Sequence, residues 1–295
     1  MQISARPSAR SVSPPLCPVT TRHNMGDDVT APIALTIAGS DSGGGAGIQA
    51  DLKTFSALGC YGASVVTALT AQNTRTVALV EPASHAMIAG QMRAVLDDLD
   101  VRAVKLGMLG GAQAIATVAG GLDGCGLPIV LDPVMVAKSG DRLLPPDATD
   151  ALRALLACAT LLTPNLPEAA CLLGCAPATT PAQMAEQGAA LRAMGAGAVL
   201  MKGGHGDGAI CTDLLVTAQG ATPFSARRLS TRNTHGTGCT LSAAIAAGLA
   251  HGLPLEQAVG VAHRYLQRAI AAADDLCVGS GHGPVHHFHA VWSHG

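Results

Sequence analysis

The most informative segment of this sequence is Asn233-Thr234-His235-Gly236-Thr237-Gly238-Cys239-Thr240. Apolar residues spaced four apart follow it as far as Gly252, which predicts a glycine-rich turn that leads into a helix. Glycine lets the backbone turn tightly and approach a ligand closely. The unpaired N–H groups and the positive dipole at the start of the helix then form an anion site. The alternative is a plain turn that caps a helix.

Cys239 is the unusual residue of this turn, because it falls in the first turn of the expected helix. The helix dipole favours a thiolate, so we expect the thiol to have a pKa below that of free cysteine. An anion site that holds a potential proton acceptor points to phosphoryl transfer. The candidate catalytic residues are therefore Gly236, Gly238 and Cys239.

Composition excludes several classes of protein. The chain has 295 residues, of which 48% are hydrophobic, so a large core is available. Only 2% are aromatic, the net charge is −2 and there is no basic block, which argues against a nucleic-acid partner. No apolar stretch is long enough to span a bilayer. Nine cysteines without a C-x-x-C pair favour a reducing, cytoplasmic location.

The first thirty residues differ from the rest. Residues 1–22 contain four prolines, three arginines and no acidic residue, a composition that fits a disordered extension, an alternative start at Met25 or a transit peptide. We favour the extension or the alternative start. Residues 31–295 show no internal repeat and no linker, and are expected to form one domain.

From Ile33 onwards, short apolar runs alternate with helix-like segments, which indicates an α/β fold. The expected form is a three-layer α/β/α structure with a mostly parallel central sheet and helices on both faces. The candidate strands are Ile33–Ala38, Ala63–Leu69, Ala103–Leu106, Pro128–Leu131, Leu161–Thr163 and Ala198–Met201. Asp213–Thr217 and Pro223–Leu229 predict an antiparallel edge.

Polar or glycine-bearing segments follow each of these parallel strands. They are Gly39-Ser40-Asp41, Gln72, Gly107-Met108, Asp132, Asn165 and Lys202. In open α/β sheets, ligands bind beyond the carboxyl ends of the strands. The sequence therefore predicts one composite site at this edge of the sheet.

Individual segments suggest separate roles within that site, each with a plainer alternative. Asp51 lies off the apolar stripe of its helix, so its carboxylate either accepts a hydrogen bond from a ring amine or is solvated. Asn165 and Glu168, with Asp132, supply the oxygen atoms that a hydrated Mg²⁺ prefers, although Asn165 and Glu168 also suit a helix start. Lys202 either neutralises phosphate or is an ordinary surface lysine. His282, His286, His287 and His289 lack the spacing of a metal motif.

Taken together, these segments resemble the hydroxymethylpyrimidine/phosphomethylpyrimidine kinases. The resemblance runs from about Ile33 to Trp292. It is carried by Ala38-Gly39-Ser40-Asp41, Gly44–Thr54, Gln72-Asn73-Thr74, Lys138-Ser139-Gly140, Thr163–Ala169, Met201–His205, the Asn233–Thr240 segment and Gly283–His289. The resemblance implies a ribokinase-like fold, use of ATP and Mg²⁺, and synthesis of the pyrimidine diphosphate for thiamine. A homodimer is a possible assembly.

The resemblance also implies roles for single residues. Asp51 and Gln72 would hold the edge of the aminopyrimidine, in a pocket lined by Gly39, Ala46 and Met108. Lys202, Asn165 and Thr237 would face the phosphates of ATP, while Glu168 and Asp132 would hold Mg²⁺ through water. Cys239 replaces the aspartate of most superfamily members and favours this family. Some pyridoxal kinases share the cysteine, so vitamin B6 substrates remain an alternative, as does a non-catalytic binding protein.

Overall fold

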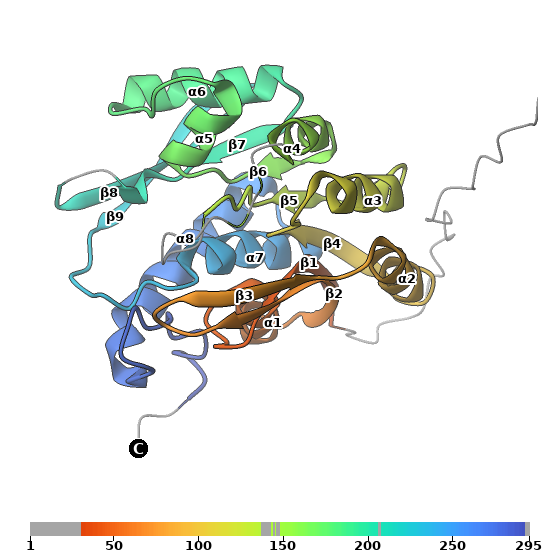
Figure 1. Cartoon of the computed structure of the whole chain (residues 1–295). Coiled ribbons are helices and arrows are strands. Elements are labelled where there is room, and N and C mark those ends of the chain that lie inside the picture. The colour runs from red at the N-terminus through yellow and green to blue at the C-terminus, as the bar shows by residue number, and fades with distance from the viewer. Residues whose placement is uncertain (1–30, 137–142, 144, 146–147, 206–207, 293–295) are drawn as a thin grey trace, which may run out of the picture.

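The computed structural model describes residues 31–136, 143, 145, 148–205 and 208–292 (Figure 1). The proposed N-terminal extension and the Lys138-Ser139-Gly140 motif lie outside these residues. The strands are β1 (Ile33–Asp41), β2 (Tyr61–Gln72), β3 (Val77–Pro82), β4 (Val101–Leu106), β5 (Ile129–Leu131), β6 (Leu161–Leu162), β7 (Ala198–Met201), β8 (Ile210–Thr217) and β9 (Gly220–Arg227). The α-helices are α1 (Gly47–Ala57), α2 (His85–Leu96), α3 (Ala112–Leu122), α4 (Thr149–Leu155), α5 (Leu166–Leu173), α6 (Pro181–Ala193), α7 (Thr237–Ala250) and α8 (Leu255–Ala271).

The nine strands found in the described residues join one sheet, in the order β3-β2-β1-β4-β5-β6-β7-β8-β9. The pairs from β2 to β7 are parallel, whereas β3 at one edge and β8 with β9 at the other are antiparallel. This confirms the mostly parallel sheet and its antiparallel edge. The chain leaves β1 for β2 on one side and later returns to β4 on the other, so a crevice opens beyond the ends of β1 and β4.

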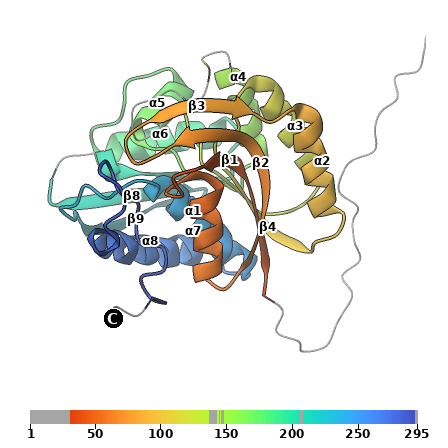
Figure 2. The same ribbon diagram turned by 60° about the horizontal axis from the view of Figure 1, so that its bottom comes forward.

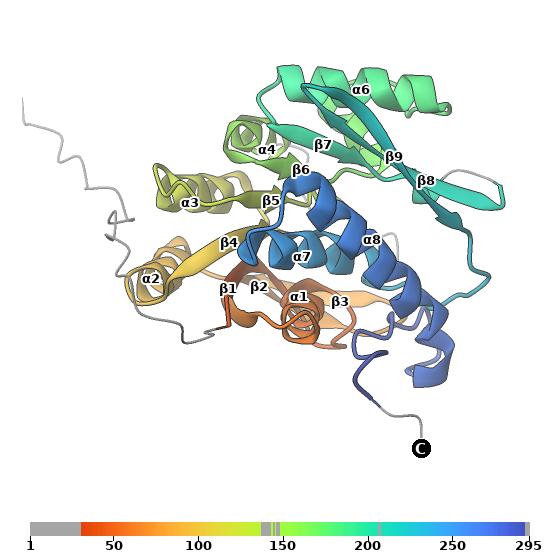
Figure 3. The same cartoon turned by 180° about the vertical axis from the view of Figure 1, so that it is seen from behind.

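Helices cover both faces of the sheet, as the alternating sequence pattern predicts. Helices α2 to α6 lie against one face, and α1, α7 and α8 lie against the other (Figures 2 and 3). Helix α7 is almost entirely buried between the sheet, α1 and α8. Its sequence is rich in alanine, which lets a helix pack closely against the strands at the centre of the fold.

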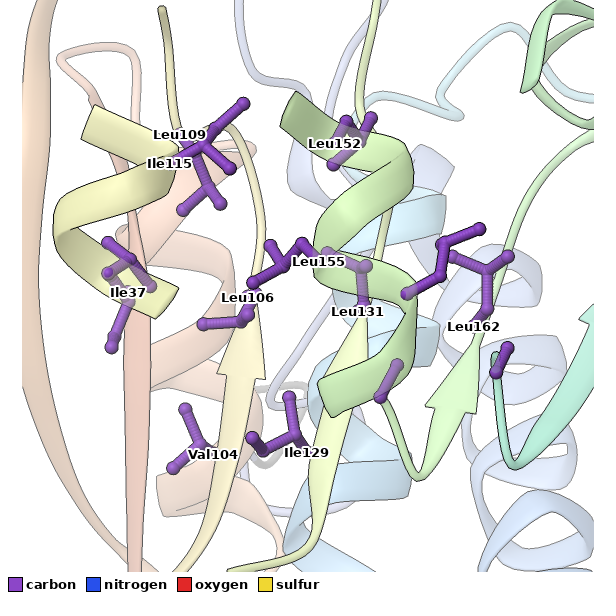
Figure 4. Close-up of a cluster of buried hydrophobic side chains, with 14 of the residues drawn as sticks. Ile37, Val104, Leu106, Leu109, Ile115, Ile129, Leu131, Leu152, Leu155 and Leu162 are labelled. Atoms are coloured by element: carbon purple, nitrogen blue, oxygen red, sulfur yellow. The ribbon is translucent and has the colours of Figure 1, made fainter. Parts of the chain in front are cut away.

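The larger core fills the space between the sheet and α2 to α6. Figure 4 shows side chains of β1, β4, β5 and β6 packed against those of α3 and α4, with Leu106, Leu131 and Leu155 in the centre. These three leucines are buried to 2% exposure or less. Burying a leucine side chain contributes about 1.5–3 kcal/mol, so this core holds the strands, and the loops at their ends, in fixed positions.

The sequence analysis did not find β3. Nearly all residues of this strand are exposed, so it has no alternation of apolar and polar positions that would reveal it. The predicted ends of β1 and β4 lie within a few residues of the observed ends.

Within the described residues, no helix is long and apolar enough to cross a membrane.

Candidate active site

A cavity of about 1020 Å³ lies at the carboxyl ends of the parallel strands. Its lining includes most of the residues that the sequence singles out: Gly39, Ala46, Gln72, Met108, Asp132, Asn165, Glu168, Lys202, Gly236, Thr237, Gly238 and Cys239. Its volume is at the upper end of the range for small-molecule sites, so it has room for two ligands side by side. The residues of the predicted composite site, Asp51 and Gly107 excepted, therefore line one cavity.

The turn before α7 forms the floor of this cavity with the glycine loop after β1. Gly236 has φ 80°, and a Cβ atom there would clash with the backbone oxygen of Gly45. Only glycine fits at this contact. No side chain caps the N-terminus of α7. The start of the helix therefore offers backbone N–H groups to an anion in the cavity.

One end of the cavity is charged and is built around Asp132. This carboxylate is 1% exposed and accepts hydrogen bonds from Lys202 Nζ at 2.8 Å and from the hydroxyl of Thr163 at 3.2 Å. Lys202 is not an ordinary surface lysine, since its side chain is only 14% exposed. A Cβ atom on Gly238 would lie 3.4 Å from Lys202 Nζ. The anion-binding turn and the charged cluster therefore adjoin.

Asn165 and Glu168 complete this charged end. They form a capping box at the start of α5, in which each side chain accepts a hydrogen bond from the backbone N–H of the other at 2.8 Å. Burial, and secondarily Asp132, raise the pKa of Glu168 to about 7, although Lys202 at 3.9 Å opposes the shift. Two carboxylates here share one ammonium group, so a further cation would be stabilised.

The carboxylate oxygens of Asp132 and Glu168 fit Mg²⁺, which prefers hard oxygen ligands and keeps several of its waters. Within the described residues, no group of three His, Cys, Asp or Glu side chains is arranged to hold a metal ion. A magnesium ion at this end of the cavity would therefore depend on water and ligand phosphates for its other ligands.

The prediction of a lowered pKa for the Cys239 thiol is wrong. Burial raises the pKa of this thiol to about 11, even though Lys105 and the backbone N–H of Gly47 act in the opposite direction. Asp51 and Asp132 add to the rise. The sequence argument considered only the helix dipole, whereas loss of hydration and two nearby carboxylates dominate. At neutral pH the resting side chain is a protonated thiol.

Asp51 also differs from expectation. Its side chain is fully buried and does not line the cavity, because one carboxylate oxygen accepts from Lys105 Nζ at 2.8 Å and from the Thr36 hydroxyl at 2.6 Å. Lys105 is fully buried too. Burial alone would lower the pKa of Lys105. Asp51, Cys239 and Asp132 raise this pKa by a larger amount, so the ammonium stays charged. Asp51 holds a buried cation beneath Cys239, and Lys105 is the group that lines the cavity.

The other end of the cavity is built from neutral and hydrogen-bonded groups. Gly39 and Met108 meet there, since the Gly39 N–H donates to the Met108 oxygen at 3.1 Å and any side chain at Gly39 would strike the Met108 methyl group. Gln72 ends β2 beside them. Its amide lies 3.3 Å from Nε2 of His235, which itself contacts Asp41 at 3.0 Å. Gly39, Met108 and Gln72 are uncharged, so we call this part of the cavity the neutral end.

Sequence reasoning missed the roles of Lys105, His235 and Asp213. Lys105 was detectable, because it replaces an apolar residue at an inward position of a buried strand. Asp213 accepts a hydrogen bond from the Gly203 N–H at 2.8 Å and thereby holds the turn after Lys202. His235 had no local signal, since its partner Asp41 is 194 residues away.

The C-terminal histidines support the anion-binding turn. His287 Nε2 lies 3.0 Å from the Thr240 hydroxyl on α7, and burial lowers the pKa of His287 to about 3. The N–H of His235 donates to the oxygen of Gly283, and the N–H of Val285 donates to the oxygen of His235. These bonds tie the end of the described chain to the turn before α7.

Comparison with known proteins gives a consistent family. The family model described as phosphomethylpyrimidine kinase matches residues 41–286. The chain is 59% identical over 261 residues to the hydroxymethylpyrimidine/phosphomethylpyrimidine kinase of Rhizobium meliloti, which covers 88% of this chain and 98% of that protein.

Solved structures agree with this result. The phosphomethylpyrimidine kinase of Clostridium difficile 630 is 42% identical, with a TM-score of 0.73, and the match covers 81% of this chain and 99% of that one. The pyridoxal kinase of Staphylococcus aureus in complex with pyridoxal is 33% identical, with a TM-score of 0.81, over 89% of this chain and 95% of that one. The fold is thus shared with a phosphomethylpyrimidine kinase and with a pyridoxal kinase.

Proposed function

Because this chain belongs to the phosphomethylpyrimidine kinase family, we propose that it is a kinase that uses ATP to phosphorylate 4-amino-5-hydroxymethyl-2-methylpyrimidine and then its monophosphate. The product would be the pyrimidine diphosphate precursor of thiamine. One observation carries the proposal. The Gly236–Cys239 turn adjoins Lys202 through Gly238 and adjoins Gln72 through His235, and all of these residues line one cavity.

The charged end would hold the phosphates of ATP. Phosphoryl transfer needs positioning and stabilisation of negative charge more than covalent catalysis. Lys202 and the backbone N–H groups from Gly236 to Cys239, with Thr237 among them, would stabilise charge on the moving phosphoryl group. Asn165 would contact the nucleotide phosphates. When bound by Glu168 and Asp132, in part through water, Mg²⁺ would neutralise further phosphate charge.

The neutral end would hold the pyrimidine ring. Gly39, Ala46 and Met108 line this end, and the small size of the first two leaves room for a flat ring. Gln72 offers one donor and one acceptor, which matches the ring nitrogen and the exocyclic amine of an aminopyrimidine. We propose that Asp51 acts indirectly, by holding Lys105 in place.

Cys239 would lie beside the acceptor group. The hydroxymethyl group must lose a proton in the first reaction, whereas the acceptor of the second is an ionised phosphate. A thiol with a pKa of about 11 is protonated at neutral pH, so Cys239 would begin the cycle as a hydrogen-bond partner and not as a ready thiolate. The nearby ammonium of Lys105 is the group that would favour a thiolate later in the reaction.

An ATPase assay with three acceptor conditions tests this function. ADP release would be measured with the hydroxymethylpyrimidine, with pyridoxal and with no acceptor. We expect the pyrimidine to give the highest kcat/KM. Pyridoxal is the second candidate, because the structural similarity includes a pyridoxal kinase with pyridoxal bound. A higher kcat/KM with pyridoxal would contradict the pyrimidine assignment, and no turnover with either acceptor would favour a non-catalytic binding protein.

Three broader expectations accompany this function. We propose that residues 31–295 form one domain, that the protein functions in the cytoplasm and that two copies form a homodimer. Every cysteine in the described ranges is a free thiol, which suits a reducing compartment. Light scattering would measure the mass in solution, and a monomeric mass would contradict the dimer.

A further inference from the structure

Three side chains from distant parts of the sequence meet at the neutral end of the cavity. They are Asp41 at the end of β1, Gln72 at the end of β2 and His235 just before α7, and these elements converge in Figure 2. Asp41 is 2% exposed and His235 is 8% exposed. Nε2 of His235 lies 3.0 Å from Asp41 Oδ2 and 3.3 Å from Nε2 of Gln72. This one ring nitrogen therefore faces two polar partners.

The surroundings of Asp41 determine which hydrogen Nε2 carries. The Asp41 carboxylate also accepts hydrogen bonds from the N–H groups of Gly43 at 2.8 Å, Gly45 at 3.0 Å and Ala46 at 2.8 Å. Burial alone would raise the pKa of Asp41, but these bonds and the His235 contact hold it below its usual value. An ionised carboxylate only accepts, so Nε2 of His235 must be protonated and must donate.

A protonated Nε2 cannot accept a hydrogen bond from the amide nitrogen of Gln72. The group of Gln72 that faces His235 must instead be the amide oxygen. The oxygen and nitrogen of a glutamine amide have nearly the same shape, so the hydrogen-bond network has to decide between them. Here the hydrogen bonds of Asp41 and His235 require that the oxygen and nitrogen of the Gln72 amide be exchanged.

The contacts of the Gln72 amide on the side away from His235 lead independently to the same orientation. The Thr70 hydroxyl lies 2.9 Å from the backbone oxygen of Ser40 and 3.1 Å from Oε1 of Gln72. A hydroxyl has one hydrogen, so it donates well to only one of these two acceptors. With the amide exchanged, Gln72 donates to Thr70, and Thr70 donates to Ser40. Each contact then joins a donor to an acceptor, and the Nε2–H of His235 is shared between Asp41 Oδ2 and the Gln72 oxygen.

We propose that Asp41 and His235 form a positioning pair that fixes the Gln72 amide, oxygen towards His235 and nitrogen towards Thr70, and so fixes the orientation of the substrate ring. This proposal deepens the proposed function and rests on it. The amide oxygen would accept from the exocyclic amine, and the amide nitrogen would donate to the neighbouring ring nitrogen. The amine then lies on the side of His235, the residue that precedes Gly236.

The consequence for the reaction follows from the substrate itself. In 4-amino-5-hydroxymethyl-2-methylpyrimidine, the hydroxymethyl group is attached next to the carbon that bears the amine. With the amine on the His235 side, the hydroxymethyl group is carried towards the Gly236–Cys239 turn. The opposite amide orientation would turn it away. The pair therefore selects an amine over a carbonyl at this ring position, because a carbonyl with an adjacent ring N–H reverses the order of donor and acceptor.

A comparison of two substrates tests this selection. The kcat/KM of the aminopyrimidine alcohol would be divided by that of its 4-oxo analogue, in the unaltered protein and in His235→Met and His235→Gln. Methionine removes the donor at similar size, whereas the glutamine amide can donate to both Asp41 and Gln72. We expect a ratio of about 100 or more in the unaltered protein and in His235→Gln, and of less than about 10 in His235→Met.

His251→Gln is the matched control, because the side chain of this exposed histidine at the other end of α7 contacts only the Leu58 oxygen among the described hydrogen bonds. It should leave the ratio unchanged. A merely structural role of His235 would lower both activities equally in His235→Met, and an unchanged ratio there would overturn the proposal.

A direct measurement covers the case in which His235→Met does not fold. Nitrogen-detected NMR of the imidazole groups in the unaltered protein, with His235→Gln used to assign the signal, should find Nε2 of His235 protonated at pH 7. An unprotonated Nε2 would overturn the proposal. This reading needs no turnover, so it separates failure of the pair from failure of the proposed function, which would appear as absent activity on the aminopyrimidine in the unaltered protein.

Discussion

The two ends of the cavity balance their charges in different ways. At the neutral end, Asp41 is surrounded by donors, and a chain of matched hydrogen bonds continues through His235 to Gln72. At the charged end, Asp132 and Glu168 share the single ammonium of Lys202, and the pKa of Glu168 rises to about 7. One end is complete before any ligand arrives, whereas the other still attracts a cation.

The difference teaches how one cavity can serve two substrates. A matched network holds a fixed pattern of donors and acceptors, which suits recognition of a rigid ring. An unbalanced cluster suits a ligand that brings its own metal ion and negative charge. Changes at the charged end should therefore lower kcat, and changes at the neutral end should raise KM for the acceptor.

Lys202→Met should have the largest effect. Removal of the ammonium eliminates the main positive charge at the phosphate end, and we expect kcat to fall about 1000-fold with little change in KM for the pyrimidine. Steady-state kinetics with both substrates varied would measure this. Lys202→Met should also lower stability, because it leaves the buried Asp132 carboxylate without its ammonium partner. Addition of Asp132→Asn should restore the stability but not the activity. A rise in pyrimidine KM without loss of kcat would contradict the division between the two ends.

Asp51→Ala should mainly affect stability, and this revises the direct contact with substrate that the sequence implies. The substitution leaves the Lys105 ammonium buried and unpaired, at a cost of about 3–5 kcal/mol. Urea unfolding measures the change. Asp51→Asn combined with Lys105→Met should recover most of the stability. Normal stability with a raised pyrimidine KM would instead favour direct contact between Asp51 and the ring.

Cys239→Ala should separate the two phosphorylations. We expect kcat to fall about 100-fold for the alcohol and less than about 5-fold for the monophosphate, because only the alcohol must lose a proton. Each step would be assayed with its own acceptor. Cys60→Ala is the matched control, since Cys60 is another buried thiol with a pKa of about 11. Equal losses in the two steps would favour a positioning role alone.

Gln72→Ala should raise KM for the pyrimidine about 10-fold or more and leave KM for ATP unchanged, because it removes a donor and an acceptor from the neutral end only. Initial rates with each substrate varied in turn would measure both constants. Asn73→Ala is a neighbouring control, since Asn73 accepts backbone hydrogen bonds within its own turn. Unchanged pyrimidine KM in Gln72→Ala would remove this residue from the pocket.

The pH dependence of stability should show the smallest effect. The pKa of the Cys239 thiol is about 11 in the folded protein, against an ordinary value of 9.0. Between these values the folded chain retains a proton that the unfolded chain has lost, so stability falls as the pH rises through this window. Urea unfolding at pH 8 and pH 10.5 should find a fall about 1–2 kcal/mol smaller in Cys239→Ala. Equal falls would contradict the raised pKa.

Local sequence patterns predicted the parts of the fold that depend on neighbouring residues. The ends of β1, β4 and β5 were found because apolar runs stop at glycine or polar residues there, and the charged end of the cavity followed. The predicted state of Cys239 was wrong because burial and two carboxylates from other elements raise the pKa of its thiol. The predicted position of Asp51 was wrong because this residue pairs with Lys105, a buried cation from another strand. The pairing of Asp41 with His235 depends on tertiary contact alone and leaves no local signal.

The close contact between Gly45 and Gly236 also has a consequence for synthesis of the protein. The loop after β1 is made early, but its partner turn leaves the ribosome only after about two-thirds of the chain has followed. Until then the Asp41 carboxylate lacks His235, and the binding surface for the acceptor is incomplete. Catalytic competence therefore requires the late segment before α7, because it supplies both His235 and Gly236.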